Sequence, residues 1–121
     1  MKTIDLEIKD YGKIILRKLG YMEKCNLQDK MVKVTIETDK LGNPKEEREV
    51  SVGKLSFWLV VYSIKTMPNY PEFWKLDESK KADIVSHFGE GDNDPENLGE
   101  LIFQKAQDFN KFMPTEELKK K

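Results

Sequence analysis

The sequence predicts a single α+β domain in which N-terminal antiparallel β-hairpins precede a helical bundle of about three to four helices. Apolar and polar residues alternate with a period of two in residues 3–9 and 31–38, which is typical of half-buried strands. After residue 52 the apolar residues recur at helical spacing instead. Because the strands come before the helices and do not alternate with them, the class is α+β. We divide the 121 residues only into a strand-rich part (1–52), a helical part (53–113) and a charged tail (114–121).

The composition is that of a small globular protein and argues against nucleic acid as a partner. A chain of 14.2 kDa can bury a core without the help of a disulfide or a metal ion. It has 21 basic and 22 acidic side chains, and its pI is about 5.9. Nucleic-acid-binding proteins normally carry a basic face and have a high pI, so we expect no nucleic-acid partner.

Cysteine usage and hydropathy predict a cytoplasmic protein. The single cysteine, Cys25, cannot form an intramolecular disulfide, and this fits a reducing compartment. The first ten residues lack the apolar core of a signal peptide. The apolar run at residues 57–61 is far shorter than the roughly 20 residues that cross a bilayer, so we expect no membrane span.

The first half of the chain predicts two hairpins. The alternating residues 3–9 and the apolar run at 13–19 are both of strand length, and the three residues between them can turn the chain. A short helix is expected over residues 20–30. The second hairpin then pairs a strand over 31–38 with a returning strand over 46–52, across a loop at 39–45 that is rich in Gly, Asn and Pro.

Residues 53–67 predict a central helix that is buried on most sides. The apolar residues follow the i, i+3, i+4, i+7 spacing and fill much of the remaining circumference. Two adjacent valines favour a strand, but about 15 residues is long for a strand and ordinary for a helix. Pro68 ends the helix. We expect Trp58 and Leu59 to anchor the core, so that Trp58→Ala costs about 3–5 kcal/mol.

Two further helices follow, separated by an acidic loop. Residues 69–76 form a loop with three aromatic residues, and Asp77 is well placed to cap the next helix. Residues 89–97 combine acidic residues with two glycines and a proline, which is typical of a solvated loop. The apolar residues of 98–113 recur at near-ideal helical spacing and predict the last helix, which Pro114 ends.

No pattern in the sequence predicts a catalytic, cofactor or metal site. An EF-hand calcium loop that starts at Asp92 needs Gly and Glu where the chain has Asn97 and Phe103. One cysteine and one histidine, Cys25 and His87, cannot supply the ligands of a structural zinc site. A Cys–His catalytic pair would also require these two residues to be adjacent in space. We therefore expect a protein that is not an enzyme and binds no cofactor or metal ion.

The aromatic and apolar residues of the second half are the best candidates for contacts with another protein. Tyrosine and tryptophan dominate the energetics of protein interfaces, although the same residues can simply complete a core. The candidate interaction residues are Tyr70, Phe73, Trp74, Leu101, Ile102, Phe109 and Phe112.

Three features of the chain carry a family resemblance. Residues 12–19 contain the phrase G-x-(apolar)-x-L-R-x-L, and residues 63–68 contain the phrase S-(apolar)-x-x-x-P. A helical second half then closes with the amphipathic segment 98–113. This order of elements resembles the tail assembly chaperones of long-tailed phages and related proviruses.

The resemblance implies a small α+β protein that binds the helical tape measure protein in the host cytoplasm and leaves the finished particle. Such a chaperone needs an apolar groove for an amphipathic helix. The same surface could instead support self-association. The alternatives are another small tail or virion accessory or adaptor protein, and a small ligand-binding domain of unknown specificity.

Overall fold

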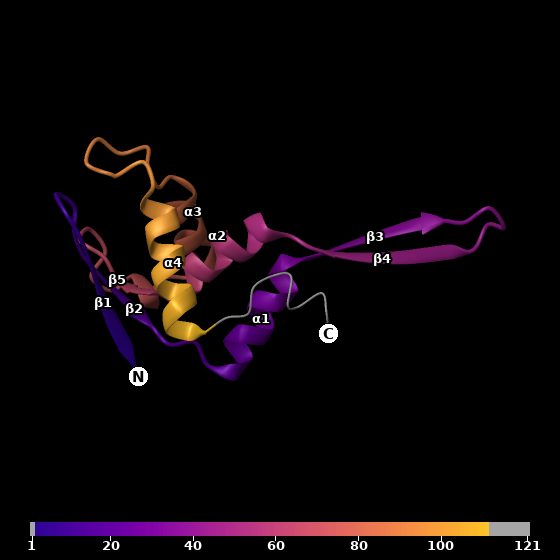
Figure 1. The fold of residues 1–121 in the computed structure, drawn as a ribbon, viewed down its shortest axis with the longest axis horizontal. Helices are drawn as coiled ribbons and strands as arrows, with labels where there is room; N and C mark the ends of the chain where they lie inside the picture. Colours follow the sequence, from indigo (N-terminus) through magenta and orange to yellow (C-terminus); the bar gives the residue numbers. More distant parts are fainter. Residues whose placement is uncertain (1, 112–121) are drawn as a thin grey trace.

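The computed structural model describes residues 2–111, without the side chains of residues 33–35 and 46–50. It consists of a body, in which helices pack on a small sheet, and a long hairpin that projects from this body (Figure 1). The strands and helices confirm the predicted α+β class. Their order is β1 (Thr3–Ile8), β2 (Gly12–Arg17), α1 (Tyr21–Met31), β3 (Val32–Thr38), β4 (Pro44–Val50), α2 (Val52–Ser63), β5 (Ile64–Thr66), the 3-10 turn η1 (Phe73–Lys75), α3 (Glu78–Ser86) and α4 (Leu98–Asn110).

The sheet of the body is antiparallel and has the order β1–β2–β5. The predicted first hairpin is confirmed, with Leu6 of β1 paired with Ile14 of β2. At its turn, Asp10 and Gly12 take positive φ values of 63° and 138°. A Cβ on Gly12 would lie 2.7 Å from Cγ of Pro68, so glycine is required there for a second reason. The phrase that begins at Gly12 and the phrase that ends at Pro68 thus meet in space.

The prediction of a helix over residues 53–67 is wrong for its last turn. The helix α2 ends at Ser63, and Ile64–Thr66 form the edge strand β5. Isoleucine and threonine favour strands. Pairing of Ile64 with Leu16 of β2 also gives the backbone hydrogen bonds and leaves Ile64 only 1% exposed.

The helix α2 forms the centre of the body and packs against α1, α3 and α4. Leu59 is completely buried, as predicted. Trp58, in contrast, is only half-buried and lies beside the end of α1, where the Nζ of Lys30 is 4.4 Å from its ring centroid. No helix among residues 2–111 is long and apolar enough to cross a membrane. Among the described residues, the completely buried hydrophobic side chains are Ile14, Leu16, Leu27, Leu59, Val61, Phe73, Leu98, Ile102 and Ala106.

The last two helices begin and end close to where the sequence predicts. The Oδ1 of Asp77 accepts a hydrogen bond of 2.7 Å from the backbone N–H of Lys80, which confirms the predicted cap of α3. The helix α4 ends at Asn110, because Lys111 adopts a left-handed conformation with φ 52°. The predicted helix is therefore too long at Lys111, whereas Phe112, Met113 and the charged tail lie outside the described residues.

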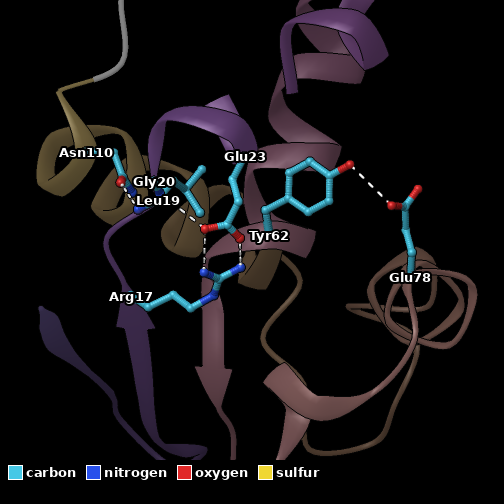
Figure 2. A network of polar contacts seen from close by, with 7 residues as sticks. All are labelled: Arg17, Leu19, Gly20, Glu23, Tyr62, Glu78 and Asn110. Carbon is cyan, nitrogen blue, oxygen red and sulfur yellow. Dashed lines mark hydrogen bonds and ion pairs between the residues drawn. The ribbon is translucent and has the colours of Figure 1, made fainter. Parts of the chain in front are cut away.

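A set of polar contacts connects distant parts of the body (Figure 2). Arg17 makes a two-pronged ion pair with Glu23, whose Oε1 also accepts the N–H of Gly20 at the start of α1. The hydrogen bond from Arg17 lowers the pKa of Glu23. The Oδ1 of Asn110, at the end of α4, accepts the buried N–H of Leu19 at 2.7 Å. This last bond connects residues that are 91 positions apart and thereby holds the two ends of the fold together.

The hairpin β3–β4 leaves the body where α1 ends and returns where α2 begins (Figure 1). Its seven residue pairs run in register from Val32↔Val50 to Thr38↔Pro44. At the tip, Oδ1 of Asp39 accepts hydrogen bonds from the backbone N–H groups of Leu41 and Asn43, so the chain turns within the predicted loop. The returning strand was predicted two residues too late, because β4 runs from Pro44 to Val50 and Ser51 already caps α2. The hairpin exposes an apolar side chain at Ile36, whose exposed fraction is 71%.

Candidate functional site

Two hollows lie on either side of Phe88, which lines both of them. The larger is a cleft of about 470 Å³ between the β1–β2 turn, the segment after β5, the end of α3 and the acidic loop. Its walls combine aromatic and apolar residues with three carboxylates. The lining residues are Tyr11, Met67, Asn69, Tyr70, Asp83, Ile84, His87, Phe88, Glu90, Gly91 and Asp94.

His87 lies at this acidic cleft between two carboxylates. Its Nδ1 is 2.7 Å from Oε2 of Glu90, and its Nε2 is 3.6 Å from Oδ1 of Asp83. The hydrogen bond with Glu90 raises the pKa of His87 above its ordinary value, and the charge of Asp83 adds to this effect. The side chain of His87 is 63% exposed, so these contacts lie at the surface and do not isolate a catalytic base from water.

Tyr11 supplies a half-buried ionisable group to the cleft. Burial raises the pKa of its phenol, and the nearby Asp94 raises it further. The hydroxyl is therefore protonated at neutral pH and can donate a hydrogen bond to an acceptor in the cleft. Carboxylates beside tyrosine rings suit a cationic group better than an anionic one.

The smaller hollow is a groove of about 290 Å³ where the first turns of α2 and α4 meet the end of α3. Its apolar floor is made by Phe57, Val60, Val85 and Phe88. Glu96 and Glu100 also line it, and both are exposed. The lining residues thus combine an apolar surface with negative charge.

Two helical glycines border this groove without being required by the internal packing. Gly53 is in the first turn of α2, and Gly99 is in the first turn of α4. A Cβ added to Gly99 would meet no atom within 4 Å, and one added to Gly53 would meet only the Oγ of Ser51, at 4.0 Å. Glycine lowers helix stability by up to about 1 kcal/mol relative to alanine. Their absent side chains leave the groove open to a close approach by another backbone.

The structure separates the candidate interaction residues into buried and exposed groups. Phe73 and Ile102 are completely buried, and this assigns them to the core. Tyr70, Trp74 and Leu101 are each 38–39% exposed. Phe109 is half-buried beneath Lys18, whose Nζ is 5.3 Å from the ring centroid, and Phe112 lies outside the described residues.

The groove and several exposed apolar residues were not predicted as interaction sites. In the sequence, the residues of the groove floor cannot be distinguished from ordinary core residues. One signal could have identified them: α2 is apolar on nearly every side, which is more apolar surface than one buried face requires. Tyr21, Met22 and Leu41 are 85%, 69% and 86% exposed. No periodic pattern marks them, because each lies at the beginning of a helix or in a turn.

The remaining chemical candidates have simple places in the fold. Cys25 is half-buried in α1, whereas His87 is exposed after the last turn of α3. Among the side chains that the structure describes, no group of three or more His, Cys, Asp or Glu is arranged to hold a metal ion. Comparison of the chain with protein-family models, with curated proteins and with solved structures finds no match.

Proposed function

We propose that this protein is a non-enzymatic interaction factor that holds an amphipathic helix of another protein in the groove between α2, α3 and α4. An amphipathic helix presents apolar residues at i, i+3 or i+4, and i+7, and such residues fit a floor formed by Phe57, Val60, Val85 and Phe88. Glu96 and Glu100 favour a helix whose apolar stripe is flanked by lysine or arginine.

The observation that carries this proposal is the pair of glycines at the groove. Glycine has a low intrinsic helix propensity, and the open space around Gly53 and Gly99 gives no internal reason for a residue without a side chain. A partner backbone that passes close to the first turns of α2 and α4 supplies such a reason.

The resemblance to tail assembly chaperones suggests the class of partner. In that family the bound protein is the helical tape measure protein, and binding takes place in the host cytoplasm. A long amphipathic helix exposes apolar surface that aggregates unless it is covered, and a groove of this kind covers it. The other small tail or virion proteins remain the alternative within the same class of function.

The test is a binding titration against the tape measure protein of the encoding genome, or its amphipathic segments as peptides. Gly99→Leu adds a large side chain at the groove, where its Cβ would meet no atom within 4 Å, and it also favours the helix. We expect it to lower the affinity at least tenfold while the thermal midpoint stays the same or rises. The matched control is Gln104→Leu, which adds the same side chain to an exposed position of α4 outside the groove. Equal affinities for Gly99→Leu and wild type would contradict the proposal.

The acidic cleft favours a second candidate function, a small ligand-binding domain. Three carboxylates and two tyrosines line a hollow of about 470 Å³, which suits an organic amine or guanidinium compound. Isothermal titration with arginine, agmatine and spermidine tests this candidate. Saturable binding that is lost in Asp94→Asn would support a small-molecule function, and no heat beyond dilution for any of the three would count against it.

A further inference from the structure

The hairpin β3–β4 has an outer edge to which the described chain offers no third strand. A two-stranded ribbon is at best marginally stable by itself in water, and an unpaired edge is a template for another strand. The backbone hydrogen bonds at the two ends of the hairpin show which residues face outward. At the tip, the N–H of Asp39 donates to the C=O of Asn43 at 2.9 Å, and at the base, the N–H of Ser51 donates to the C=O of Met31 at 2.8 Å.

These two bonds determine the hydrogen-bonding pattern of the whole ribbon. Hydrogen-bonded pairs alternate along an antiparallel ladder, and the register shows no bulge between the two ends. The odd-numbered residues of β3 therefore direct their backbone N–H and C=O groups toward β4 and form hydrogen bonds with it. The even-numbered residues direct their backbone N–H and C=O groups away from β4, and these residues are Val32, Val34, Ile36 and Thr38.

The two edges of the ribbon are not equally able to pair. On β4 the outward-directed residues are also the even-numbered ones, beginning with Pro44, which has no N–H to donate. Proline on an edge strand is a common obstacle to further pairing. The edge of β3 contains no proline and keeps every donor.

The sequence of β3, VKVTIET, is complementary to itself in an antiparallel arrangement. If a two-fold axis passes through Thr35, residue 34 pairs with residue 36 of the second copy, and both are outward-directed, as hydrogen-bonded pairs require. Lys33 then stands opposite Glu37 of the second copy, so residues of opposite charge form the two flanking pairs. All seven residues of β3 have a partner in this register.

We propose that two copies of the chain associate through the edges of β3, centred on Thr35, to form a continuous four-stranded antiparallel sheet. The pairing gives hydrogen bonds to the outward backbone groups of β3 and brings Ile36, which is 71% exposed, beside Val34 of the second copy. This dimer does not depend on the helix-binding groove, which lies on the body at the ends of α2, α3 and α4.

The first test measures the dimer dissociation constant by sedimentation equilibrium. In the hairpin itself Lys33 pairs with Glu49 and Glu37 pairs with Lys45, so each charge is exchanged together with its partner on β4. Lys33→Glu/Glu49→Lys keeps opposite charges within the hairpin but places a glutamate at position 33 opposite Glu37 of the second copy. Glu37→Lys/Lys45→Glu places like charges there in the same way, so each exchange should weaken the dimer roughly tenfold. The variant with all four substitutions restores opposite charges between the copies and should recover the wild-type constant. Wild-type protein that stays monomeric at millimolar concentration, or a variant with all four substitutions that is as weak as the two exchanges, would overturn the proposal.

The second test is disulfide formation in a Cys25→Ser background. Thr35→Cys places two cysteines on the two-fold axis in a non-hydrogen-bonded pair, where a Cα separation of about 4.5 Å allows a disulfide. Ile36→Cys is the control, because the two copies of residue 36 are diagonal neighbours and not a direct pair. Efficient oxidation to a dimer for Thr35→Cys alone supports the register, whereas equal oxidation of both variants would show random collision and contradict it.

Discussion

The strands β1 and β3 have the same alternating pattern but different surroundings. In β1 the residues Ile4, Leu6 and Ile8 are half-buried and pack on the core. In β3 the equivalent pattern ends in Ile36, which is 71% exposed. The difference arises because β1 belongs to a three-stranded sheet with β2 and β5 and is packed against α4, whereas the described residues give the hairpin β3–β4 no third strand.

This comparison shows what an alternating pattern does and does not contain. The alternating pattern predicts that one face of the strand packs against apolar groups. It does not predict which part of the structure supplies those groups. In the body, α4 packs against β1. For the hairpin we infer that the edge of β3 pairs with a second copy of the chain, which brings Ile36 beside Val34 of that copy.

The largest expected difference between the two regions is the cost of a polar substitution. Ile14→Thr in β2 removes a completely buried aliphatic group and buries a hydroxyl, so it should lower the free energy of unfolding by about 2–4 kcal/mol. Ile36→Thr in β3 should change it by about 0.5 kcal/mol or less, because threonine suits an exposed strand. Urea unfolding at low protein concentration measures both. Equal losses would show that Ile36 is covered even in the monomer.

A smaller effect is expected at the base of the hairpin, where Trp58 contacts the end of α1. Because Trp58 is half-buried, we expect Trp58→Ala to cost about 2–3 kcal/mol, less than a fully buried tryptophan would. A double-mutant cycle with Lys30→Met should assign about 0.5–1 kcal/mol of this to the cation–π contact. A coupling energy near zero would show that the contact between Lys30 and Trp58 does not stabilise this junction.

The body is also held by a contact between residues far apart in the sequence, whereas the strand pairs of the hairpin join residues close together in the sequence. A substitution of Asn110 measures how much this long-range contact stabilises the body. Asn110→Ala removes the acceptor of the buried Leu19 N–H, and an unsatisfied buried donor costs about 1–2 kcal/mol. The control is Asp108→Ala, an exposed position on the same helix. Chemical unfolding of both variants measures the difference, and we expect only Asn110→Ala to be clearly destabilised.

The smallest effect is expected from His87, at the surface of the body. Its pKa in the folded state is raised, chiefly by Glu90, so the stabilising contribution of these contacts is fully present below about pH 6.5. The contribution is lost as the pH rises through the higher folded pKa. An NMR titration of this single histidine should give a pKa above the ordinary value, and Glu90→Gln should lower it. An unchanged titration in Glu90→Gln would contradict the contact.

The sequence was most informative where one local signal decides the outcome. The first hairpin, the cap at Asp77 and the helix near residue 98 follow from alternation, capping chemistry and helical spacing, which act over a few residues. The end of α2 was predicted incorrectly, because Ile64 becomes part of a strand only through its pairing with distant Leu16. Of the candidate interaction residues, Phe73 and Ile102 proved to be core, and only their tertiary neighbours could show it.

Composition and periodicity therefore established an α+β chain, its turns, most of its helices and the strands that compose its hairpins. Three features depended on the tertiary structure: the groove between α2, α3 and α4, the acidic cleft beside Phe88 and the uncovered edge of β3. The physical reason is that apolar spacing records which side chains avoid water, and this is the same for a core and for an interface. Only the packing of the chain shows which of those side chains it covers by itself and which it leaves exposed.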